Sequence, residues 1–105
     1  MSMTFYAATR DEDKCYGPVM PNFSDALDMA YGNAFGVMEA LGIEHTDSSV
    51  TLDINDFIAI CAEYILISAE NMSVDRNDYT DKRVLQLLNI ALRGRKAGAT
   101  HIVGA

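Results

Sequence analysis

The most constraining feature of this sequence is a nearly apolar segment of 13 residues, Phe57 to Ala69, in which Glu63 is the only charged side chain. A helix that crosses a bilayer needs roughly 20 apolar residues, so the segment is too short to be a membrane span. We expect it to form a helix that begins at Asp53 or Asn55 and ends near Glu70. The sequence therefore predicts a protein that is not inserted in a membrane.

The same predicted helix is apolar around most of its circumference. Its acids Asp56, Glu63 and Glu70 are seven residues apart, which places them on one narrow stripe. Such a helix needs cover on nearly every side, and three or four elements of a small domain do not supply it. We therefore expect the chain to self-associate into a homo-oligomer. The residues expected at this interface are Phe57, Ile58, Cys61 and Ile65.

A second helix is predicted near the C-terminus, from Thr80 or Asp81 until Gly94 and Gly98 weaken and end it. Apolar residues recur along it at helical spacing and define one face. They are Val84, Leu85, Leu88, Ala91 and Leu92.

A third helical pattern ends at Leu41, where Gly42 supplies the C-terminal stop. Two interpretations of its start are open. In the first, Ser24 or Asn22 caps one helix that runs through to Leu41. In the second, Asn33 caps a shorter helix, 34–41, and residues 26–31 have another conformation.

Short segments at both ends of the chain favour strands. The segments are Met3 to Thr9 and Ala99 to Ala105, and Val50 to Ile54 is a third candidate because it alternates. Arg10 to Pro21 contains Gly17-Pro18 and is predicted to be a loop. These elements predict an α+β fold that is mainly helical, with about three helices and a small β-ribbon joining the N- and C-terminal strands.

Length and composition indicate one domain, residues 1–105. Hydrophobic residues make up 50% and charged residues 22%, which disfavours intrinsic disorder. The N-terminal residues lack the pattern of an export signal, so we expect the protein to stay in the cytoplasm. Cys15 and Cys61 are accordingly interpreted as free thiols.

Charge is divided unevenly along the chain. Residues 1–81 contain all 15 acids and three bases, a net charge of −12, whereas residues 82–105 contain five bases and no acid. Because the overall net charge is −7, the protein is not expected to bind nucleic acid in general. A local basic site in residues 82–105 is still compatible with this overall net charge.

The basic residues of the predicted C-terminal helix define a candidate site for an anionic ligand. Lys82, Arg93 and Lys96 share the polar face of the helix, and Arg83 lies beside them. Cations are also favoured at a helix C-terminus by the helix dipole, which is the simpler explanation of this stripe. The residues that we consider for ligand binding are Asn33, Lys82, Arg83, Arg93, Lys96 and His101.

The sequence presents no catalytic motif. Cys15, His45, Cys61 and His101 are scattered singly, unlike the paired ligands of a zinc site, and the phosphate-loop and dinucleotide fingerprints are absent. We therefore assign no catalytic residues, no metal and no cofactor, and favour a non-enzymatic role. His101 as a general base is the enzymatic alternative.

Two fragments carry a resemblance. Residues 33–42, NAFGVMEALG, and 97–103, AGATHIV, resemble segments of short, uncharacterised proteins encoded by phages and prophages. The resemblance implies a phage accessory protein that acts in the bacterial cytoplasm against a host defence system. It implies no established biochemical activity.

Two functional hypotheses follow. The first is a non-enzymatic phage accessory protein that binds a host protein through its acidic surface and inhibits a host defence system. The second is an oligomeric protein that sequesters an anionic, nucleotide-like small molecule with the basic residues of the predicted C-terminal helix.

Overall fold

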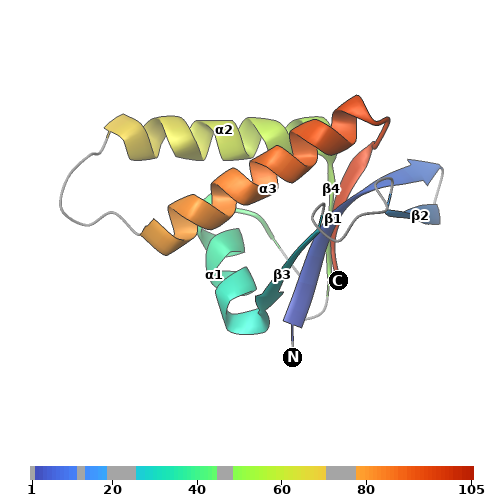
Figure 1. Cartoon of the computed structure of the whole chain (residues 1–105). Coiled ribbons are helices and arrows are strands. Elements are labelled where there is room, and N and C mark those ends of the chain that lie inside the picture. The colour runs from blue at the N-terminus through green and yellow to red at the C-terminus, as the bar shows by residue number, and fades with distance from the viewer. Residues whose placement is uncertain (1, 12–13, 19–25, 45–48, 71–77) are drawn as a thin grey trace.

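The computed structural model describes residues 2–11, 14–18, 26–44, 49–70 and 78–105. Five strands and three helices occur in these ranges (Figure 1). Their order is β1 (Ser2–Asp11), β2 (Lys14–Pro18), β3 (Ala26–Ala30), α1 (Tyr31–Leu41), β4 (Val50–Asp53), α2 (Ile54–Glu70), α3 (Asp78–Lys96) and β5 (His101–Gly104). The fold is mixed α+β with three helices, as predicted.

The sheet is antiparallel and is built around β1. On one edge β1 pairs with β5, which pairs in turn with β4. On its other edge β1 pairs with β3 through its first half and with β2 through its second half. The predicted ribbon between the two end strands is therefore confirmed, and it forms the centre of a larger sheet.

The three helices cover one face of this sheet, and α2 and α3 lie side by side with opposite chain directions (Figure 1). Alternating residues of the strands point toward the helices. Phe5, Ala7 and Ile102 lie on this covered face and are at most 2% exposed. Residues between them, such as Tyr6 and His101, therefore point to the opposite face.

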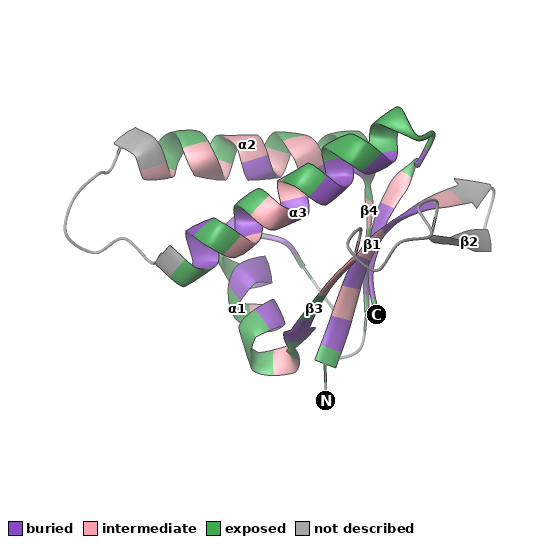
Figure 2. Ribbon diagram, in the orientation of Figure 1, coloured by how far each residue is buried: buried purple, intermediate pink, exposed green. Residues whose placement is uncertain are grey.

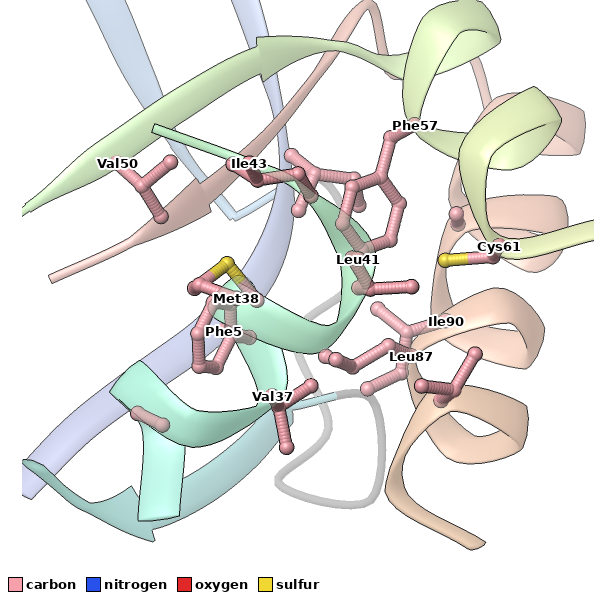
Figure 3. Close-up of a cluster of buried hydrophobic side chains, with 14 of the residues drawn as sticks. Phe5, Val37, Met38, Leu41, Ile43, Val50, Phe57, Cys61, Leu87 and Ile90 are labelled. Atoms are coloured by element: carbon pink, nitrogen blue, oxygen red, sulfur yellow. The ribbon is translucent and has the colours of Figure 1, made fainter. Parts of the chain in front are cut away.

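One hydrophobic core lies between the sheet and the helices (Figures 2 and 3). Phe57 and Cys61 of α2 contribute to it together with Leu87 of α3, and none of the three is more than 1% exposed. Met38 of α1 and Phe5 of β1 are fully buried in the same cluster. The core is where the helices and the sheet stabilise each other by excluding water from apolar side chains.

At the start of α1 the structure agrees in part with the second interpretation, in which the helix is short and the residues before it have another conformation. The helix begins at Tyr31, with Ala30 as its N-cap residue, so Asn33 is inside the first turn and is not the cap. Ala26–Ala30 forms β3, whose Leu27 and Met29 pair with Phe5 and Met3 of β1. Leu27 and Ala30 are spaced as on one face of a helix, whereas Leu27 and Met29 are spaced as in a strand, and pairing with β1 decides between them. Asn22 and Ser24, the alternative caps, are outside the described residues.

Two helix boundaries agree with the prediction. Gly42 has a φ of 71°, and the amide of Ile43 donates to the carbonyl of Met38, which closes α1 with a left-handed cap. The carboxylate of Asp53 accepts hydrogen bonds from the amides of Asn55 (2.9 Å) and Asp56 (3.2 Å) and so caps α2.

The predicted loop at Arg10 to Pro21 is wrong in its first part. β1 continues to Asp11 and pairs with β2, with a register shift between Ala8 and Thr9. Pro18 is the last residue of β2, an edge position in which a missing amide donor is tolerated. Residues 19–21 are outside the described part of the chain.

Gly94 has a packing role that the sequence does not predict. It is buried within α3, which ends two residues later at Lys96, as predicted, and Gly98, with a φ of 102°, lies beyond the last helical residue. A methyl group on Gly94 would collide with the side chain of Ala7 on β1. Gly94 and Ala7 therefore set the distance at which α3 lies on the sheet.

We predict that Gly94→Ala lowers the free energy of unfolding by about 1 to 3 kcal/mol, because the added methyl overpacks the contact between α3 and β1. Gly36→Ala is the matched control, since nothing lies within 4 Å of the added atom and Gly36 is exposed on α1. The control should gain about 0.5 to 1 kcal/mol from helix propensity. Denaturant unfolding measures both, and equal effects of the two changes would contradict this role of Gly94.

Candidate functional site

The basic side chains gather on one helix. Among the side chains that the structure describes, all Lys and Arg residues lie on α3. Arg93, Arg95 and Lys96 are in its last turn, where the negative end of the helix dipole stabilises cations. Lys82, Arg93 and Lys96 are exposed, which agrees with their placement on a polar face. They form the stripe that the sequence predicts.

This stripe does not converge on one point. Lys82 and Lys96 are 14 residues apart, which corresponds to about 21 Å along a helix. The guanidinium of Arg83 lies 5.0 Å from the centre of the Tyr79 ring and donates to Oε1 of Gln86 at 2.7 Å. Its Nε is buried and has no hydrogen-bond partner among the described residues. Arg83 is therefore held against its own helix.

The other two ligand-binding candidates are elsewhere. Asn33 is exposed on α1. His101 pairs with Ala8 and Asp53 across the sheet and points away from the helices, because its neighbour Ile102 points toward them. The Nδ1 atom of His101 is 2.8 Å from Oγ1 of Thr100. His101 and the bases of α3 are thus on opposite sides of the sheet, and the structure does not bring the six candidates into one site.

The interface residues expected on α2 divide into two groups. Phe57 and Cys61 are fully buried in the core of the chain itself and have no surface to offer a partner, so their assignment to an interface is corrected (Figure 3). Ile58 and Ile65 are half-buried and pack against that core. Within one chain, α3 and the sheet bury more of α2 than its sequence predicts. The sequence of a helix shows which residues share a face but not which neighbouring element packs on that face.

The large apolar side chains that are exposed come from positions that the interface prediction did not name. On α2, Leu66 is 65% exposed and Ile67 is 50% exposed. On α3, Leu85 is 52% exposed and Leu92 is 40% exposed. Figure 2 shows exposed residues along the outer sides of both helices. Apolar side chains that gather on one surface are typical of interaction sites, whereas isolated ones are not.

A buried polar cluster between α2 and α3 was not predicted. The carboxylate of Asp81, 8% exposed, accepts hydrogen bonds from the hydroxyl groups of Tyr64 (2.8 Å) and Ser68 (3.1 Å). The sequence places Thr80 or Asp81 at the start of the helix, whereas α3 begins at Asp78 and Asp81 lies within it. The signal available was a serine and a tyrosine on an otherwise apolar helix, which require partners when buried.

The same cluster borders a small depression lined by Tyr64, Ile65, Ser68, Asp81 and Leu85. Its volume of about 200 Å³, part of it open to solvent, is below the roughly 300 Å³ at which ligand pockets begin.

In the described ranges, no three His, Cys, Asp or Glu side chains are arranged to hold a metal ion. No helix in those ranges has the length and apolar character that crossing a membrane requires.

We predict that Tyr64→Phe lowers the free energy of unfolding by about 1 to 3 kcal/mol, because the buried carboxylate of Asp81 loses a donor. Tyr31→Phe is the control, since its ring stacks on Phe35 at a centroid distance of 5.6 Å and this contact is kept. The control should change stability by less than about 0.5 kcal/mol. Similar losses in both variants would contradict the role of the Tyr64 hydroxyl.

We also predict a pH effect from Cys61. Burial raises the pKa of this free thiol from 9.0 to about 12. The unfolded chain therefore ionises Cys61 above pH 9 while the folded chain keeps the neutral thiol, so stability falls between these pH values by about 1.4 kcal/mol per pH unit. Cys61→Ala should start from a lower stability and lack this decrease. Parallel pH curves for parent and variant would contradict the prediction.

Comparisons with known proteins add no relative from which a role could be transferred. No protein family, no curated protein and no solved structure matches this chain. The function therefore has to be inferred from the charges and surfaces described above.

Proposed function

We propose that the protein is a small non-enzymatic binding protein, a phage accessory factor that binds a host protein in the bacterial cytoplasm and inhibits a host defence system. The contact is made by its acidic surface. The observation that supports this proposal is the separation of charge: the bases whose side chains the structure describes are confined to α3, and exposed acids lie elsewhere. These exposed acids are Asp28, Glu39, Glu44, Asp53, Asp56 and Glu63.

Some of these acids already have a structural role. Asp53 caps α2, and the Asp28 carboxylate accepts a hydrogen bond from Thr4 at 3.0 Å. Glu39 and Glu44 are different, because they flank the C-terminus of α1 at Gly42. The negative end of a helix dipole disfavours acids there, and the last turn of α1 contains no base. Helix stability does not account for Glu39 and Glu44, which favours a role in binding.

An acidic surface suits a target whose own site is basic. Opposite charges steer two proteins together and raise the association rate. A host protein that binds nucleic acid has such a site, since phosphate contacts dominate its affinity. The protein would then compete with nucleic acid for that site, which is a means of inhibition that requires no catalysis.

We predict that Glu39→Gln/Glu44→Gln weakens binding to the host target without loss of stability. The target is first captured from bacterial lysate with the tagged protein, identified and purified, and its affinity is measured at roughly 0.1 and 1 M salt, where Debye lengths are about 10 and 3 Å. The parent should bind more weakly at high salt and displace nucleic acid from the target. Unfolding of the variant should require slightly more free energy, by about 0.3 to 1 kcal/mol, because two acids leave the negative end of α1.

Glu39→Asp/Glu44→Asp is the control, because it keeps both charges and should keep the affinity. Affinity that is the same for all three proteins and independent of salt would contradict the proposal. So would heat stabilisation by a nucleotide that is lost in Lys82→Gln/Arg93→Gln/Lys96→Gln, since that result supports the anionic-ligand hypothesis instead.

A further inference from the structure

The side of α2 and α3 that faces away from the sheet carries an apolar band. On α2 it consists of Ala59, Ala62 and Leu66, at spacings of three and four residues. On α3 it consists of Leu85, Leu88 and Leu92, at the same spacings. Leu66, Leu85 and Leu92 are between 40% and 65% exposed. We call these six residues the apolar band.

Charges of opposite sign border the apolar band. On α2 the exposed charged side chains next to it are Asp56 and Glu63, both acidic. On α3 the exposed side chains next to it are Lys82, Asn89 and Lys96, which are basic or neutral. The surface therefore has an acidic border along α2, an apolar centre and a basic border along α3.

Side-chain contacts fix how α2 and α3 are aligned within the chain. Nη1 of Arg95 donates to Oδ1 of Asn55 at 3.1 Å, which places the start of α2 beside the end of α3. The contact of Ser68 with Asp81 places the other ends together. Asp56 is thus level with Lys96 along the helix layer, and Glu63 is level with Asn89.

Two copies of this surface can face each other about a two-fold axis in two ways. If the axis is perpendicular to the helices, α2 lies against α2 and acids face acids. If the axis is parallel to the helices, each residue keeps its level and α2 lies against α3 of the other copy. Asp56 then faces the partner's Lys96, and Glu63 faces the partner's Asn89. Only the parallel axis brings opposite charges together.

We propose that a second copy of this chain covers the apolar band, in a homodimer whose two-fold axis runs parallel to α2 and α3. A second copy is the expected occupant because the surface is complementary to itself. Its acidic border and its basic border have opposite charges, and Asp56 lies at the same position along the helices as Lys96. This inference does not depend on the proposed host target, because the acids argued and tested for that binding, Glu39 and Glu44, lie at the end of α1 and not beside the apolar band.

The size of the surface is sufficient for a dimer. Helices of 17 and 19 residues are about 25 Å long or more, and two adjacent helices are roughly 20 Å wide. Each copy therefore contributes about 500 Å², and the two together about 1,000 Å², which is at the lower end of specific interfaces. The expected dimer is reversible at micromolar concentrations.

The first test compares two neighbouring residues on α2. Leu66→Glu places a charge within the apolar band, and we expect the dimer dissociation constant, measured by sedimentation equilibrium, to rise roughly 100-fold or more. Ile67→Glu is the matched control, because Ile67 is also half-exposed but lies about 100° away from Leu66 around the helix and outside the band. Leu85→Glu repeats the test on α3. Circular dichroism confirms that each variant is folded.

The second test exchanges charges. Asp56→Lys alone and Lys96→Glu alone should each weaken the dimer, because like charges then face each other, and the double variant should restore the parent dissociation constant to within about threefold. A parent chain that sediments as a monomer at about 100 μM would overturn the proposal. Equal effects of Leu66→Glu and Ile67→Glu would overturn the apolar band as the interface. A double variant no tighter than the single variants would overturn the parallel axis.

Discussion

β1 is hydrogen-bonded on both of its edges, and the position of every other element follows from that arrangement. Its residues Met3 and Phe5 are buried in the core on the face that the helices cover. The small side chain of Ala7 allows α3 to pack closely on β1 at Gly94. A close approach of helix to strand gives dense packing, which is what stabilises a small domain with few elements. The helix layer can then be shared by α2 and α3, whose outer sides are left facing solvent.

The distribution of charge follows the helices more than the sheet. On α3, Arg93, Arg95 and Lys96 are placed where the helix dipole favours them, whereas Glu39 and Glu44 at the end of α1 are placed where it does not. The helix dipole therefore accounts for the first set of charges and not for the second. The proposed self-association and the proposed target binding involve different residues, the borders of the apolar band in the first case and Glu39 and Glu44 in the second.

The sequence was sufficient for the helices and the end strands, because periodicity and caps such as Asp53 and Gly42 are local signals. It was insufficient for β3, where Leu27 fits a helical spacing with Ala30 and a strand spacing with Met29, and only pairing with β1 selects the strand. It was also insufficient for the candidate site. His101 and the α3 bases have compatible chemistry, yet the alternation of β5 places His101 on the other face, and this information is in the three-dimensional pairing of strands.

β5 is inserted between β1 and β4, and its residue Ile102 pairs with Ala7, which is 95 positions earlier in the chain. Pairing over such a separation is slow, because the intervening chain has to lose its freedom before the contact forms. Until then both β1 and β4 have an edge without its final partner, and unpaired edges recruit strands from other molecules. The docking of β5 thus covers one edge of β1 and one edge of β4, so the rate of this step sets how long newly made chains expose these two edges.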